Sequence, residues 1–175
     1  MSRISRNDLV SAITGVQAMD MKQKEQLADE IFRSQPNMLG SVLVLNRLGV
    51  SLQKIDFALN ILFVCFRAMK ASGLSWPTIS EDDLDRQLRR FTAIAQFADD
   101  LNESLREDSM QQYIADHPEK ELLAYVQTET AKWLAHIVPE EADKHVMLAA
   151  WNMVNCIAFV ALPGSKATSR RGQTG

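Results

Sequence analysis

Few residues in this chain have the type and spacing that metal binding or acid–base catalysis requires. The chain has three histidines, and one of them, His145, stands four residues after Glu141. Residues four apart share one face of a helix, so this pair could supply two metal ligands. A carboxylate-bridged di-metal bundle needs Glu-x-x-His on two helices, and the chain contains neither that pattern nor His-Glu-x-x-His. We therefore interpret the two residues as a solvated ion pair and expect no metal and no cofactor.

Motifs for nucleophilic catalysis and for phosphate binding are also missing from the sequence. There is no Gly-x-Ser-x-Gly turn, neither cysteine has a histidine near it in the sequence, and the seven glycines are scattered. The sequence therefore favours a non-enzymatic role. An enzyme would need Glu141 and His145 to converge with a further carboxylate such as Asp56.

Two stretches, 55–69 and 146–162, are far more apolar than the rest, and each carries a thin line of polar residues. At about 100° per residue in a helix, the polar residues of each line fall on one stripe. A helix that is apolar nearly all round is buried, so its polar side chains need hydrogen-bond partners. With Glu141 at the start of the second line, the candidate ligand or interface residues are Asp56, Asn60, Arg67, His145, Asn152 and Asn155.

The two stripes admit a plain and a sharper interpretation. In the plain one, the first stripe is a narrow edge exposed to water, and Asn152 and Asn155 form a core hydrogen-bond pair or a subunit contact. In the sharper one, the stripes face each other or a common cavity. Apolar walls with a few convergent polar groups are the usual composition of a small-molecule pocket.

The elements that position these residues are all predicted to be helices. Only 7 glycines and 5 prolines punctuate the chain, which argues against a strand-rich fold. Ser5 with Asp8, and Ser80 with Asp83, have the spacing of capping boxes. After a first helix that begins at Ser5, apolar periodicity predicts helices over about 21–34, 37–48, 52–71, 81–106, 109–116, 118–138 and 139–162. We expect one compact bundle of seven or eight helices with the two apolar helices at its centre.

Length and composition predict a single domain over residues 1–162, followed by a disordered basic tail over 163–175. The second apolar stretch is short for a membrane span and contains Trp151 and two asparagines, so we expect no membrane association. Cys65 and Cys156 are predicted to be core residues, with a disulfide between the two helices as the alternative. A cytoplasmic protein fits these features best.

One short segment is similar to the turn of helix-turn-helix DNA-binding proteins. It runs through Leu48, Gly49 and Ser51 to Ile55, and such a resemblance implies a recognition helix after the glycine. Leu45 stands where that turn usually has a small residue. The following helix offers only Gln53 and Lys54 as polar groups for a DNA groove. The net charge of −3 gives no electrostatic reason for binding nucleic acid.

These observations predict a helical protein that acts by protein–protein interaction, as a homodimer. More helix faces are apolar than a small bundle can hide, and large exposed apolar patches usually mark partner surfaces. The alternative is a small-molecule-binding or sensor bundle with a pocket for a small apolar ligand between the two apolar helices. An enzymatic function is the third interpretation, and a helix-turn-helix DNA-binding regulator is the fourth.

Overall fold

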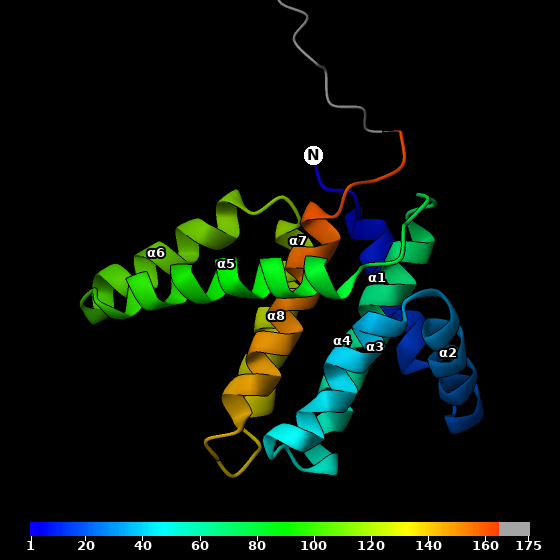
Figure 1. Ribbon diagram of the computed structural model, residues 1–175, viewed down its shortest axis with the longest axis horizontal. Coiled ribbons are helices and arrows are strands. Elements are labelled where there is room, and N and C mark those ends of the chain that lie inside the picture. The colour runs from blue at the N-terminus through cyan, green and yellow to red at the C-terminus, as the bar shows by residue number, and fades with distance from the viewer. Residues whose placement is uncertain (165–175) are drawn as a thin grey trace, which may run out of the picture.

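The computed structural model describes residues 1–164, apart from the side chains of residues 97 and 98, and within that part the chain is all-α (Figure 1). Most of the expected tail, 165–175, lies outside the described residues. The elements are α1 Arg6–Gln17, α2 Met21–Ser34, α3 Pro36–Leu43, the 3₁₀ helix η1 Val44–Leu48, α4 Leu52–Ala71, α5 Glu81–Asp99, α6 Glu103–Asp116, α7 Lys120–Leu134 and α8 Asp143–Phe159. The predicted all-α class is confirmed.

The two apolar helices, α4 and α8, form the centre of the bundle. They pack against each other, and α1 covers α4 while α5 and α7 cover α8. Residues 61–66 of α4 and 150–158 of α8 are buried without interruption. Cys65 and Cys156 are both buried and free, so the core interpretation is confirmed, and burial raises the pKa of each thiol to about 12.

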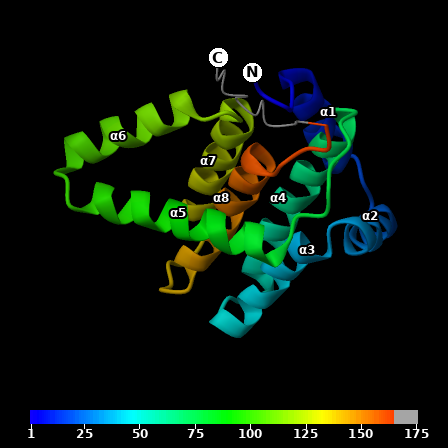
Figure 2. The same ribbon diagram turned by 45° about the horizontal axis from the view of Figure 1, so that its top comes forward.

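The predicted helix over 81–106 is wrong in one respect, because it breaks between Asp99 and Glu103. The side chain of Asn102 caps α6 by accepting the backbone N–H of Leu105 at 2.9 Å. Arg106 of α6 donates back to the carbonyls of Asp99 and Leu101, at 3.3 and 3.4 Å. The chain therefore reverses, and α5 and α6 form a hairpin that extends from the body (Figures 1 and 2).

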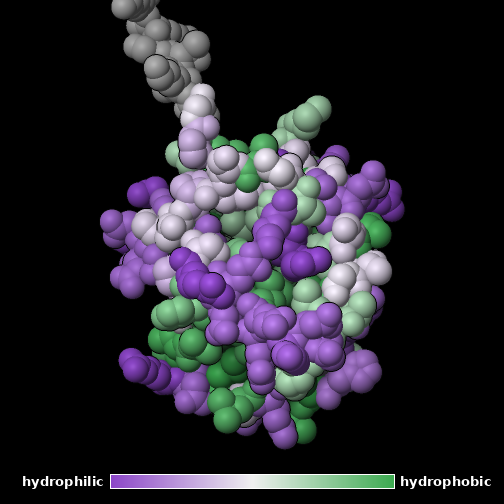
Figure 3. Space-filling view, turned by 90° about the vertical axis from the view of Figure 1, so that its right-hand side faces the viewer, coloured by the Kyte–Doolittle hydropathy of each residue, from purple (hydrophilic) through white to green (hydrophobic). Residues whose placement is uncertain are grey.

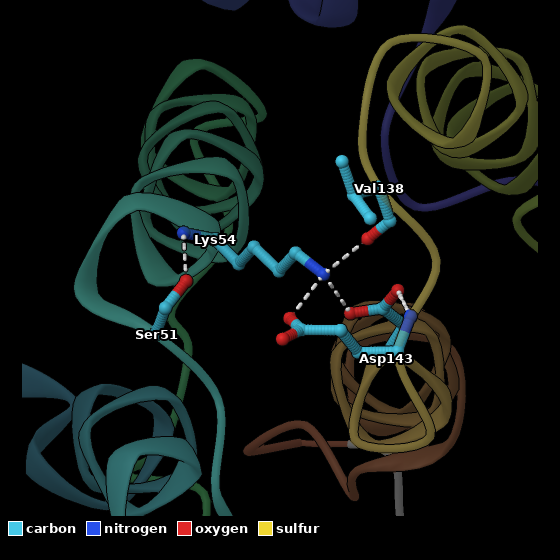
Figure 4. A network of polar contacts seen from close by, with 5 residues as sticks. Ser51, Lys54, Val138 and Asp143 are labelled. Atoms are coloured by element: carbon cyan, nitrogen blue, oxygen red, sulfur yellow. Dashed lines mark hydrogen bonds and ion pairs between the residues drawn. The ribbon is translucent and has the colours of Figure 1, made fainter.

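The last predicted helix, 139–162, also begins later than expected, at Asp143, after a turn. A cluster around Lys54 holds this turn against the start of α4 (Figure 4). The Lys54 ammonium donates to the Val138 carbonyl at 2.9 Å, to Glu140 at 2.6 Å and to Asp143 at 2.7 Å. Asp143 in turn accepts the backbone N–H of Glu140 at 2.8 Å. All three ammonium protons therefore have acceptors, and the turn has one defined position relative to α4.

The first residues of the chain are bound to the far end of the bundle. The Glu119 carboxylate accepts the backbone N–H groups of Arg3 and Ile4, at 2.6 and 3.3 Å. The Arg3 guanidinium donates to the Ile157 and Val160 carbonyls at the end of α8, at 3.0 and 2.6 Å. These bonds satisfy acceptors that a helix end leaves open.

Among residues 1–164, none of the helices combines the length and the apolar character that crossing a bilayer demands.

Candidate functional site

An open groove lies between the α3–η1 segment, the first half of α5 and the middle of α8. Its volume is about 570 Å³, within the range of small-molecule sites. The walls are mainly apolar, formed by Val44, Leu45, Leu48, Leu84, Leu88, Leu148 and Ala149. The polar side chains that line it are Asn37, Ser41, Glu81, Asp85, His145 and Asn152.

Asn152 is a polar residue of the groove lining whose amide forms only one of its expected hydrogen bonds. It is 6 % exposed, and its Nδ2 donates to the Leu84 carbonyl at 3.0 Å. A carbonyl only accepts, so this bond fixes which end of the amide points at α5. The Oδ1 atom is buried and has no hydrogen-bond partner among the described residues. An unpaired buried acceptor costs about 1–3 kcal/mol, so this atom needs an explanation.

The charged side chains that line the groove are both acidic. Glu81 and Asp85 lie in the first turns of α5 and are exposed, and no cation of the described residues pairs with either carboxylate. No lysine or arginine of residues 1–164 lines the groove. His145 is half-buried at its edge. The groove therefore offers apolar area and negative charge, whereas the unpaired Oδ1 of Asn152 is itself buried.

Asn155, one turn after Asn152, has a different environment. Its Oδ1 accepts from the Tyr113 hydroxyl at 3.2 Å and lies 2.9 Å from Nε2 of His117. The backbone N–H of Glu119 donates to Nδ1 of His117 at 3.0 Å, so Nδ1 is unprotonated and Nε2 carries the proton. Burial lowers the pKa of His117, which keeps the ring neutral. Asn155 thus serves the packing of α8 against α6, outside the groove.

The polar stripe of α4 does not line this groove. Asp56 is exposed, and Asn60 and Arg67 are half-buried. The guanidinium of Arg67 lies beside α1, where a Cβ added to Gly15 would stand 3.2 Å from Nη2. His145 and Asn152 therefore both line the groove, whereas the three polar residues of α4 lie outside it.

The remaining chemical interpretations find little support in the described residues. Glu141 pairs with Lys144 at 3.4 Å, with an exposed carboxylate, and precedes α8. Within residues 1–164 no group of three or more His, Cys, Asp or Glu is placed to hold a metal ion. Lys54, which the helix-turn-helix interpretation needs at a DNA surface, is instead bonded to Glu140 and Asp143.

Sequence reasoning missed the walls that α3, η1 and α5 contribute to the groove. The available signal was the run of apolar residues at 42–45, which is too apolar for a single buried stripe on a short helix. Val42 and Leu45 are buried, while Leu43 and Val44 are 54 % and 42 % exposed.

Comparison of the chain with protein-family models, with curated proteins and with solved structures finds no match in any of the three.

Proposed function

We propose that this protein is a non-enzymatic interaction protein that forms a homodimer through one apolar end. The observation that carries the proposal is a concentration of exposed large apolar side chains where η1, the start of α4 and the α7–α8 turn meet. We call this the apolar end; its residues are Leu43, Val44, Leu48, Leu52, Leu134 and Val138. Figure 3 shows apolar side chains gathered on the lower part of one side of the molecule, the end at which Figure 1 places η1.

All six side chains of the apolar end are substantially exposed. Val138 is 81 % exposed and Leu52 is 72 % exposed, and the least exposed of the six, Leu134, is still at 40 %. The Lys54 cluster places the α7–α8 turn against the start of α4, so that Leu52 and Val138 belong to the same end of the molecule. Contiguous apolar surface on a folded domain usually marks a contact with another chain.

A second copy of this chain is the occupant that the charges favour. The Lys54 ammonium within the apolar end already forms ion pairs with Glu140 and Asp143, so it does not require an opposite charge on a partner. An apolar patch is complementary to itself, and a two-fold axis would place one patch against the other.

The affinity that this surface supports is modest. Burying a leucine or valine completely contributes about 1.5–3 kcal/mol, so a half-exposed one contributes about 1 kcal/mol. Six such residues on each of two copies give a gross gain of about 12 kcal/mol, from which an association cost of at least about 4 kcal/mol is subtracted. The remaining 8 kcal/mol corresponds to a dissociation constant of about 1 µM, which is the tightest dimer expected.

The test is the molar mass by light scattering over about 1–100 µM protein, a range that begins at this tightest expected dissociation constant. We expect the mass to rise from monomer to dimer, and the doubly substituted variant Leu52→Asp, Val138→Asp to remain monomeric. Asp is favourable in the first turn of a helix, so Leu52→Asp does not unfold α4. The matched control is Val10→Asp on α1, which is 54 % exposed and lies outside the apolar end. A wild-type protein that stays monomeric, or a double variant that still dimerises, refutes the proposal.

The small-molecule alternative has its own observation, the groove, although the groove lies beside α8 and not between α4 and α8 as the sequence suggested.

A further inference from the structure

We propose that the dimer contact extends from the apolar end into the groove, where Arg47 of each copy pairs with Glu81 and Asp85 of the other. This inference rests on the homodimer proposed above and names the residues that fix how the two copies are oriented. Three observations carry it: the residues that the apolar end shares with the groove, the symmetry of such a contact, and the unpaired charges on the two sides of the groove.

The groove lies beside the apolar end, and the two share residues. Val44 and Leu48 line the groove and are 42 % and 47 % exposed. The α8 residues of the lining lie between the η1 wall and the α5 wall of the groove, because α8 packs against both η1 and α5. A second copy that covers Val44 and Leu48 therefore also lies over the groove and faces the α5 wall.

A two-fold axis exchanges the two walls of the groove. In a two-fold contact, one residue of the first copy meets a different residue of the second, and the same two residues meet again with the copies exchanged. With the axis beside Val44 and Leu48, η1 of each copy faces the α5 wall of the other. Charges on η1 therefore meet charges on α5 twice in each dimer.

The charges on the two walls are opposite in sign and have no partners within one copy. Arg47 is the one charged residue of η1, is exposed, and forms no ion pair with any of residues 1–164. A 3₁₀ helix has three residues per turn, so Arg47 lies on the same face as Val44. Glu81 and Asp85 line the α5 wall and are exposed, again without an ion pair to any described residue.

These charges contribute specificity more than affinity. Leucine and valine side chains pack against many apolar surfaces, so the apolar end alone does not fix the orientation of the two copies. Exposed ion pairs add little to affinity, whereas like charges placed opposite each other disfavour an arrangement. An arrangement with Arg47 against Arg47 is therefore excluded, and the one with Arg47 against the two carboxylates is selected.

Charge reversal in two separate variants tests whether these residues meet between copies. The first variant is Arg47→Glu, and the second is the pair Glu81→Arg, Asp85→Arg. Each variant alone places like charges opposite each other at two symmetric positions, whereas a dimer of one variant with the other restores opposite charges at both. By light scattering over about 1–100 µM protein, we expect each variant alone to dimerise about tenfold more weakly than the wild type, and an equimolar mixture to recover the wild-type affinity.

Two control variants separate this effect from damage to the fold. Asp82→Arg reverses an exposed carboxylate on the first turn of α5 that does not line the groove, and Arg33→Glu reverses an exposed arginine of α2. A cation in the first turn of a helix opposes the helix dipole, so Asp82→Arg carries the same local cost as Glu81→Arg. Neither control should change the dissociation constant, and thermal unfolding of every variant reports its stability.

The mixture of the two variants decides the outcome. Weak dimerisation of each variant alone, with recovery in the mixture, supports the proposal. Wild-type affinity of Arg47→Glu alone, or a mixture as weak as its components, overturns it while the wild-type dimer through the apolar end is still observed. A wild-type protein that stays monomeric overturns the homodimer and this contact together, so the two failures are distinguishable.

Discussion

Two asparagines on one helix, three residues apart, should respond in opposite ways to the same substitution. Asn155→Leu removes the acceptor that Tyr113 and His117 share, at 3.2 and 2.9 Å. The ring N–H of His117, which is 6 % exposed, then lacks a partner, at a cost of about 1–3 kcal/mol. The half-buried Tyr113 hydroxyl adds about 1 kcal/mol for its lost bond. We expect Asn155→Leu to lower the free energy of unfolding by about 2–4 kcal/mol.

Asn152→Leu is the matched control, because it makes the same change where one of the two amide ends has no partner. It removes the bond to the Leu84 carbonyl, which still accepts the helical N–H of residue 88, and it also removes the unpaired Oδ1. Loss of about 1 kcal/mol and relief of about 1–3 kcal/mol make the variant neutral or more stable.

Urea unfolding and thermal unfolding, each followed by circular dichroism and tryptophan fluorescence, measure both variants. At about 2–4 °C per kcal/mol for a chain of this length, the Asn155→Leu melting temperature should fall by about 5–15 °C. That of Asn152→Leu should not fall. Equal destabilisation by the two substitutions would refute the assignment of one asparagine to the core network and the other to the groove.

Three further predictions concern groups outside the groove. Because burial lowers the pKa of His117 in the folded protein, the unfolded chain binds its proton first, and stability should decline as the pH falls below about 6.5. Burial raises the pKa of Glu119, so this group acts in the opposite direction and lowers stability as the pH rises above about 4.5. In denaturant titrations, the free energy of unfolding of His117→Gln should therefore fall less steeply with decreasing pH than that of the wild type. Lys54→Met should lower stability and increase hydrogen exchange in the α7–α8 turn, because Asp143 then keeps only its backbone donor. An increase in exchange confined to other segments would contradict the role given to the Lys54 cluster. Alkylation by iodoacetamide at pH 8 should be negligible until the chain unfolds, because burial raises the pKa of both thiols to about 12; rapid labelling of the native protein would show that α4 or α8 opens.

The parts of the fold that the sequence predicted are those in which local and global preferences agree. Apolar residues run through residues 61–66 all round the helix, so burial of this part of α4 on every side was predictable from composition. The Ser5–Asp8 and Ser80–Asp83 capping boxes occur as expected, with the serine hydroxyl accepting the backbone N–H of the aspartate in each. In each capping box the determining contacts lie three residues apart in the sequence.

The site was only half predictable, because what a polar side chain faces depends on residues distant in the sequence. Asn152 and Asn155 gave the same signal, yet one meets the carbonyl of Leu84, 68 residues away, and the other meets His117, 38 residues away. The helical stripe specified a direction from α8 but not the element that lies there. Likewise, the spacing of Asp56, Asn60 and Arg67 is correct for one face of α4, and the structure places α1 beside Arg67.

The break between α5 and α6 shows the same limit at a helix end. No glycine or proline marks residues 99–103, and the apolar steps continue through Leu101 and Leu105, so periodicity alone predicts one long helix. α5 ends because the bonds made at the break replace those of a continuous helix. Asn102 is a strong N-cap for α6, and Arg106 donates to the carbonyls of Asp99 and Leu101 that the break exposes. A continuous helix would forgo those bonds and would carry α6 away from α7, against which it packs. Tyr113 and His117 would then lose their acceptor on α8, so the hairpin turn and the Asn155 network stabilise one another. Asn155→Leu should therefore loosen the hairpin as well as the core. Hydrogen exchange in this variant should be faster than in the wild type in α6, and by more than in α2, if this coupling exists.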